Sequence, residues 1–183
     1  MSISKAQARE NRARVVESAS LLFRERGYDG IGVKELMAGA GLTHGGFYNQ
    51  FRSKSALMIE ATSCGLSQLT ADSNTSDFIN YYLSRAHRDS LGQGCAIAAL
   101  GSDAARQHKD IKSVFEIGIE KLISDLSSGL SADEQKEARA KAISLLAQAV
   151  GAIVLSRACP DDALLADEIL DSCKLSLAIK LVL

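Results

Sequence analysis

The sequence predicts an all-α protein, and three observations support this fold class. Apolar residues recur at helical spacing along most of the 183 residues, and the alternation of Val, Ile and Thr with polar residues that is typical of strands is missing. The chain contains one proline and no tryptophan, and 5% of its residues are aromatic. We expect about nine helices, arranged as an N-terminal three-helix unit followed by a larger helical domain.

Three helices are predicted in the first 51 residues. Residues 9–26 carry an apolar stripe on one face, and Gly27 is the glycine expected at a helix C-terminus. A short helix is expected over 33–40, and a glycine-rich turn over 39–41 leads into a third helix over 43–51, with Thr43 as its N-cap. Two short helices joined by a tight turn are typical of a helix-turn-helix.

The remaining sequence predicts six further helices. Ser53 is expected to cap a fourth helix that begins at Lys54, and residues 73–76 to form a loop with a cap for the next one. Ser131 and Glu134 predict a capping box, and Pro160 begins the last helix. After the fourth helix, we expect helices at 77–88, 95–106, 110–128, 132–158 and 162–182.

Composition excludes several classes of protein. The sequence contains no run of about 18 uncharged apolar residues, so no membrane span is predicted. The polar N-terminus does not resemble a signal peptide, and we therefore expect a cytoplasmic protein. The sequence lacks a Ser/His/Asp grouping typical of an enzyme and a His/Cys spacing typical of a metal site. We therefore expect neither catalysis nor a cofactor. Four scattered cysteines are expected to be free thiols, namely Cys64, Cys95, Cys159 and Cys173.

Charge divides the chain at about residue 54. Residues 1–54 hold nine Lys and Arg against five Asp and Glu, whereas residues 55–183 hold twelve against seventeen. A basic N-terminal part favours an anionic partner there.

The third predicted helix has the properties that a helix in the DNA major groove requires. Small residues at its leading end, Gly45 and Gly46, would let backbone approach the bases, although each glycine costs a helix roughly 1 kcal/mol relative to alanine. Apolar anchors on its back and polar groups on its front complete the pattern. The anchors are Leu42, Phe47 and Phe51, and the polar groups are His44, Tyr48, Asn49 and Gln50, with Lys54 placed to meet a phosphate.

This segment resembles the DNA-binding signature of the TetR/AcrR family of transcriptional regulators. The resemblance implies that Tyr48, Gln50 and Lys54 contact the phosphate backbone of a double-stranded operator, and that other residues of the motif lie at or near base edges. The matching residues are Gly27, Tyr28, Gly30, Val33, Gly41, Leu42, Thr43, Gly46, Phe47, Tyr48, Phe51, Ser53, Lys54 and Leu57. Those implied near base edges are Lys34, Thr43, His44, Gly45 and Asn49.

Two positions depart from the family pattern. Gly32 stands where the family usually has Thr or Ser at the start of the second helix, although Glu35 keeps half of a capping box. Gln50 stands where the family more often has His.

The resemblance also implies a homodimer, in which the last two helices form a four-helix bundle with their copies in a second subunit. The expected contact faces are Leu145, Leu146, Ala149 and Ile153 on one helix and Leu165, Ile169, Cys173 and Leu177 on the other.

Effector residues are less well defined by the sequence. Phe78, Tyr81, Tyr82, Phe115 and Ile119 are either pocket lining or ordinary core. Cys95 is either a buried apolar filler or a thiol that senses oxidants or electrophiles, a role that requires a lowered pKa and solvent access.

Together these features predict a ligand- or redox-responsive transcriptional regulator, a repressor released from a palindromic operator by a small apolar or electrophilic effector. Residues 1–54 would be the helix-turn-helix domain, and residues 55–183 the effector-binding and dimerisation domain. The alternative is a helical-bundle interaction protein that does not bind DNA.

Overall fold

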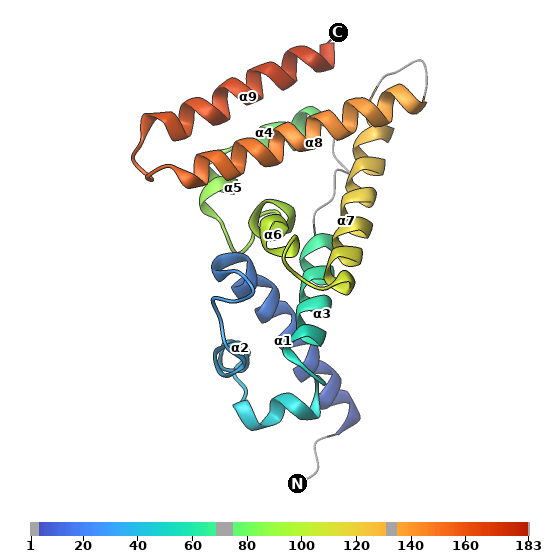
Figure 1. Ribbon diagram of the computed structural model, residues 1–183, viewed down its shortest axis with the longest axis vertical. Coiled ribbons are helices and arrows are strands. Elements are labelled where there is room, and N and C mark those ends of the chain that lie inside the picture. Colours follow the sequence, from blue (N-terminus) through green and yellow to red (C-terminus); the bar gives the residue numbers. More distant parts are fainter. Residues whose placement is uncertain (1–3, 69–74, 131–134, 183) are drawn as a thin grey trace.

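The computed structural model describes residues 4–68, 75–130 and 135–182, and within these ranges helices are the only regular secondary structure (Figure 1). Nine α-helices and one 3-10 helix confirm the predicted all-α class. Their bounds are α1 Lys5–Arg26, α2 Val33–Gly39, η1 His44–Asn49, α3 Lys54–Ser67, α4 Thr75–Tyr82, α5 Arg85–Asp89, α6 Ala96–Ala104, α7 Lys109–Ser128, α8 Gln135–Ala158 and α9 Leu164–Val182.

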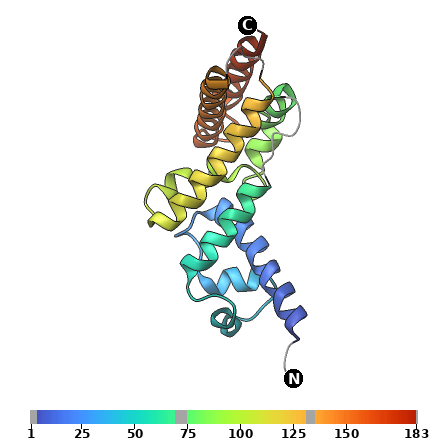
Figure 2. The same ribbon diagram turned by 90° about the vertical axis from the view of Figure 1, so that its right-hand side faces the viewer.

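The helices form an elongated molecule with different structures at its two ends. The N-terminus, α1, α2 and η1 lie at one end, whereas α8 and α9 lie side by side at the other, and α3, α6 and α7 lie between them (Figures 1 and 2). The predicted helix-turn-helix is therefore far from the two helices expected to form the dimer.

Helix α1 begins four residues earlier than predicted because Ser4 caps it, with the Ser4 hydroxyl accepting a hydrogen bond from Gln7 N–H at 3.1 Å. It ends as predicted at Gly27, whose φ of 72° is in the left-handed region that favours glycine. Its buried stripe includes Val15, Ala19 and Phe23.

Two hydrophobic cores stabilise the protein, and α7 contributes residues to both. Burial of each Leu- or Phe-sized side chain contributes roughly 1.5–3 kcal/mol. The first core joins α1, α2, η1 and α3 to residues of α6 and α7, including Leu57, Leu100 and Phe115. The second core joins α4, α7, α8 and α9, with Leu122 and Ile153 at its centre. Ile119 of α7 packs against both cores.

The segment predicted as one helix over 77–88 is two helices. Helix α4 ends at Tyr82, and Ser84 then caps α5, because the Ser84 hydroxyl accepts a hydrogen bond from His87 N–H at 3.1 Å. Residues 73 and 74 of the expected loop, and the expected capping box at 131–134, lie outside the described residues.

The predicted dimer face of α8 is wrong. Leu145, Leu146, Ala149 and Ile153 are buried in the chain's own second core, as is Leu177 of α9. Helix α8 has apolar residues on more than one side, so helical spacing alone cannot tell which side faces inward. The apolar residues that remain exposed at this end are Ile143, Val154 and Leu155 on α8 and Leu164, Leu165, Leu175 and Ile179 on α9.

Helix α8 is also long and apolar enough to cross a membrane by composition, contrary to the expectation from the sequence. Its mean hydropathy reaches 1.5 over an 18-residue window, of which 39% is buried within the protein. One such helix is weak evidence for a membrane span, because core helices of soluble proteins pass the same test.

A buried polar network joins α5 to α6 and α8. His87 Nε2 accepts a hydrogen bond from Cys95 N–H at 2.9 Å, and His87 Nδ1 lies 2.7 Å from the Tyr82 carbonyl oxygen. The imidazole is therefore neutral, with its proton on Nδ1. Arg157 of α8 donates to the carbonyl oxygens of Arg88 at 2.8 Å and His87 at 3.0 Å. Burial lowers the pKa of His87, and the charge of Arg157 lowers it further against the opposing effect of the Tyr82 carbonyl.

We expect this histidine to make the protein less stable in acid. Unfolded His87 binds a proton with a pKa near 6.5, whereas the folded protein holds that pKa lower, so the unfolded state binds more protons below this pH. The free energy of unfolding should fall by at most roughly 1.4 kcal/mol per pH unit from this group as the pH drops below about 6.5. Urea unfolding at pH 7.5, 6.5 and 5.5 measures it.

His87→Gln should remove this component of the pH dependence, whereas His44→Gln and His108→Gln, which change exposed side chains, should keep it. Equal slopes in His87→Gln and the parent protein would contradict the assignment.

Candidate nucleic-acid interface

The turn after α2 sets the direction of the next helix. Gly41 has a φ of 69°, and its N–H donates to the Ala38 carbonyl at 2.9 Å, while Leu42 N–H donates to the Met37 carbonyl at 2.9 Å. Arg14 of α1 binds the Ala40 carbonyl at 2.7 Å. Backbone and side-chain hydrogen bonds thus fix the residues that follow, 43–50, which we call the reading segment.

Phenylalanine side chains anchor the reading segment to the first core. Phe47 and Phe51 are 0% and 2% exposed, and their rings stack with centroids 5.6 Å apart. This confirms the expectation that both rings are core residues. Leu42 is half-buried and packs against the same core.

The opposite side of the reading segment faces solvent. Tyr48 is 71% exposed, with its ring edge against Phe47 at a centroid distance of 5.2 Å. The other exposed candidates on this end of the molecule are Lys34, Thr43, His44, Gly45 and Asn49. Six of the nine candidate DNA contacts, Tyr48 and these five, are therefore exposed to solvent.

Neither glycine of the reading segment is required by the fold. A Cβ at Gly45 would meet nothing within 4 Å, and a Cβ at Gly46 would lie 3.7 Å from Met37 Cε, an ordinary contact. Neither residue has a positive φ. Because glycine in a helix costs stability and nothing inside this chain requires it, a requirement from outside the chain is favoured.

The reading segment differs from the predicted α-helix in being a 3-10 helix, η1. Thr43 is its N-cap residue, as predicted, although the Thr43 side chain makes no capping hydrogen bond. Two adjacent glycines disfavour the α-helix, and the resulting 3-10 helix, at six residues, is longer than most.

Two candidate phosphate ligands have contacts within the protein. Lys54 Nζ donates to the Tyr28 carbonyl oxygen at 2.5 Å, which ties the start of α3 to the end of α1. Its other two N–H groups remain for a further partner. Gln50 Oε1 is buried, and no hydrogen bond to it is found within the described residues.

Arg12 supports the reading segment and was missed by the sequence reasoning. Its guanidinium donates to the Gln50 carbonyl oxygen and to the Glu60 carboxylate, and it lies 4.1 Å from the centroid of the Phe51 ring. Arg12 thereby holds the C-terminal end of the reading segment against α1 and α3. Its partners lie 38 and 48 residues away, and no local spacing in the sequence indicates such pairs.

The start of α2 keeps the predicted half of a capping box. Gly32 N–H donates to Glu35 Oε2 at 3.2 Å, and Arg26 binds the other carboxylate oxygen at 3.0 Å. Glycine therefore begins this helix without a side-chain hydroxyl.

Comparison with protein families identifies this helical unit. Residues 15–61, which include α2 and the reading segment, match the model described as bacterial regulatory proteins, tetR family. Residues 15–61 therefore resemble the DNA-binding part of tetR-family regulators. A comparison with curated proteins finds no match.

Solved structures of low sequence identity share the fold of this chain. A TetR transcriptional regulator from Chloroflexus aurantiacus has a TM-score of 0.77 at 23% identity, covering 97% of this chain and 96% of that one. The reduced form of Escherichia coli NemR has a TM-score of 0.71 at 20% identity, covering 92% and 95%. AibR, in complex with isovaleryl coenzyme A and operator DNA, has a TM-score of 0.61 at 18% identity, covering 92% and 98%.

The aromatic candidates of the C-terminal part do not share one pocket. Phe78 and Tyr82 are buried in the second core with ring centroids 5.1 Å apart, whereas neighbouring Tyr81 is 58% exposed. Phe115 and Ile119 lie at an open depression between α6 and α7. Within the described ranges, no group of three His, Cys, Asp or Glu side chains could hold a metal ion.

The environment of Cys95 favours the apolar-filler interpretation. Cys95 precedes α6 and is 1% exposed. Burial raises the pKa of its thiol, although the Tyr82 side chain, the backbone at Ala98 and Ile97, and the charge of Arg157 all act to lower it. A sensing thiol needs a lowered pKa and solvent access, and this one has neither.

We expect Cys95 to react slowly with alkylating agents in the native protein. At pH 7.5 its modification by iodoacetamide should be at least about 10-fold slower than that of half-buried Cys64, Cys159 and Cys173, since the thiolate is the reactive form. Peptide mass spectrometry measures the four rates, and the same measurement in urea, where they should converge, is the control. Native modification of Cys95 as fast as the others would restore the sensor interpretation.

Proposed function

We propose that this chain is a DNA-binding transcriptional repressor, which acts in the cytoplasm as a homodimer and is released from a near-palindromic operator by a small-molecule effector. Two copies of the reading segment would lie in successive major grooves, one helical turn of DNA apart. The observation that carries the proposal is the glycine-led, solvent-facing surface of residues 43–49, held by buried Phe47 and Phe51.

Each side of the reading segment fits this role. Gly45, with open space around it, would let the backbone approach DNA closely. Exposed Asn49 and His44 carry groups that bind base edges, and exposed Tyr48 and half-buried Lys54 carry donors for phosphate oxygens. The basic balance of residues 1–54 favours binding to the DNA polyanion.

The apolar ends of α8 and α9 support a dimer. The exposed apolar side chains there include Leu155 and Leu164, which are 60% and 86% exposed. A second copy of the same surface would cover them in a two-fold interface. Such an interface would also account for the apolar composition of α8 without a membrane.

Effector release requires that the ligand bind one arrangement of the two reading segments better than another. AibR, which shares the fold, is described with both a coenzyme A thioester and operator DNA. By analogy, we propose that the part of this chain beyond residue 54 binds the effector.

Changes in the reading segment should weaken operator binding without unfolding the protein. Gly45→Ala should leave stability unchanged or raise it by roughly 0.5–1 kcal/mol, because alanine favours the helix and nothing inside the chain crowds it. The parent protein first selects an operator from random DNA duplexes. Gly45→Ala and Tyr48→Ala should each bind this operator at least about 10-fold more weakly than the parent does. Fluorescence anisotropy measures the affinities.

Tyr81→Ala is the matched control, since Tyr81 is also an exposed tyrosine but lies on α4. Full operator affinity in both reading-segment variants would falsify the proposed surface. If the parent selects no duplex, or binds without salt dependence, the interaction-protein alternative is favoured.

Leu155→Glu should convert the dimer to a monomer at micromolar concentration, because it would bury a carboxylate in an apolar interface. Sedimentation equilibrium measures the mass. Ile117→Glu, which changes a 70% exposed residue on α7, should remain dimeric, and a dimeric Leu155→Glu protein would contradict the proposed interface.

A further inference from the structure

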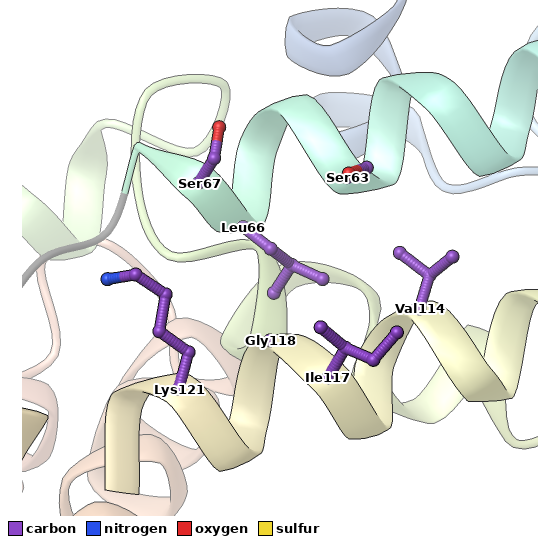
Figure 3. A pocket seen from close by; sticks show the side chains of 7 residues that line it. All are labelled: Ser63, Leu66, Ser67, Val114, Ile117, Gly118 and Lys121. Atoms are coloured by element: carbon purple, nitrogen blue, oxygen red, sulfur yellow. The ribbon is translucent and has the colours of Figure 1, made fainter. Parts of the chain in front are cut away.

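A small cleft lies between α3 and α7, with a volume of about 150 Å³ (Figure 3). Its apolar lining is formed by buried Leu66 of α3 and by Val114, Gly118 and the 70% exposed Ile117 of α7. An apolar cavity of about this volume can hold one benzene molecule. The cleft therefore fits a six-carbon ring or a short alkyl chain.

The rim of the cleft is polar and carries one lysine side chain, which is paired with a carboxylate. Ser63 and Ser67 line it from α3, and Lys121, the charged residue of the lining, extends from α7 on the facing side (Figure 3). Lys121 Nζ binds Asp125 at 2.7 Å, which leaves two N–H groups of the ammonium for a ligand. A carboxylate at the rim would meet these donors.

The two helices approach most closely at Gly118. A Cβ there would lie 2.8 Å from Leu66 Cδ1 and 3.0 Å from Leu66 Cβ, so only glycine allows this crossing without movement of Leu66. A ligand on the cleft floor would touch the same leucine side chain. Occupancy of the cleft is thereby linked to the position of α3.

We infer that this cleft binds a small amphipathic carboxylate, with a ring-sized apolar body on Leu66 and Ile117 and its carboxylate at Lys121, and that binding weakens the hold on DNA. The inference rests on the proposed function, because its second half assumes operator binding. Helix α3 would carry the effect, since Leu57 and Met58 of the same helix pack in the core that anchors the reading segment.

Benzoate is the probe, compared with benzyl alcohol and benzylamine, which keep the ring and replace the negative charge with no charge and a positive charge. Benzoate should bind the full-length protein with a dissociation constant on the order of 1 mM, as expected for a ligand of this size. The two analogues should bind at least about 5-fold more weakly. Chemical-shift changes of α3 and α7 amides measure binding and location.

Two variants test the two halves of the site. Lys121→Met should weaken benzoate binding about 5- to 10-fold and leave benzyl alcohol binding unchanged, whereas Lys141→Met, which removes an exposed lysine paired with Glu137 on α8, should change neither. Ile117→Ser should weaken all three probes. Benzoate affinity that is the same in Lys121→Met and the parent overturns the site, as does the absence of benzoate binding.

The effect of benzoate on operator affinity is measured separately. At saturating benzoate, operator affinity should fall at least about 5-fold relative to an equal concentration of acetate, which keeps the ionic strength the same. Benzoate bound in the cleft with unchanged operator affinity overturns the inference while the proposed DNA binding stands. Operator binding is measured first, before any probe is added. If the protein binds no operator in this measurement, the proposed function is contradicted.

Discussion

Helix α3 packs into both halves of the molecule, and the placement of the reading segment depends on this double contact. Leu57 and Met58, near its start, lie in the core that anchors the reading segment, whereas Leu66, near its end, lies against Gly118 of α7. The first core contains the start of α3, and the end of α3 packs against α7, which contributes to both cores. Because protein interiors are close-packed, α3 cannot shift at one end without a response at the other. This constraint connects the proposed effector cleft to the proposed DNA surface over the length of one helix.

A second set of contacts holds the end of α1 in the same arrangement. The Tyr28 hydroxyl shares a hydrogen bond with Thr62 of α3 at 2.6 Å, and Tyr28 N–H donates to Asp103 of α6 at 3.3 Å. Burial raises the pKa of Tyr28 to about 12, so the hydroxyl stays protonated at neutral pH. With Lys54 bound to the Tyr28 carbonyl, one residue joins α1, α3 and α6. Movement of α3 or α6 would therefore reach the helix-turn-helix through α1 as well.

The reading segment combines low intrinsic stability with rigid support. Two glycines and a short 3-10 helix give it little helical stability of its own. Phe47 and Phe51 fix it from behind, Arg12 holds its last carbonyl, and Arg14 holds the turn before it. A surface that binds another molecule needs groups held in place, and here packing from neighbouring helices supplies what local propensity does not.

The sequence by itself determined the helical class, the helix-turn-helix and the residues of its outer face, because helical spacing, glycine positions and the motif around Phe47 are local signals. Only the tertiary structure decided which side of α8 faces inward, since Leu145 and Leu155 are equally apolar in sequence but 4% and 60% exposed. It also decided the burial of Cys95 and the contact of Arg12 with Gln50, because burial and partners distant in sequence depend on how whole helices pack.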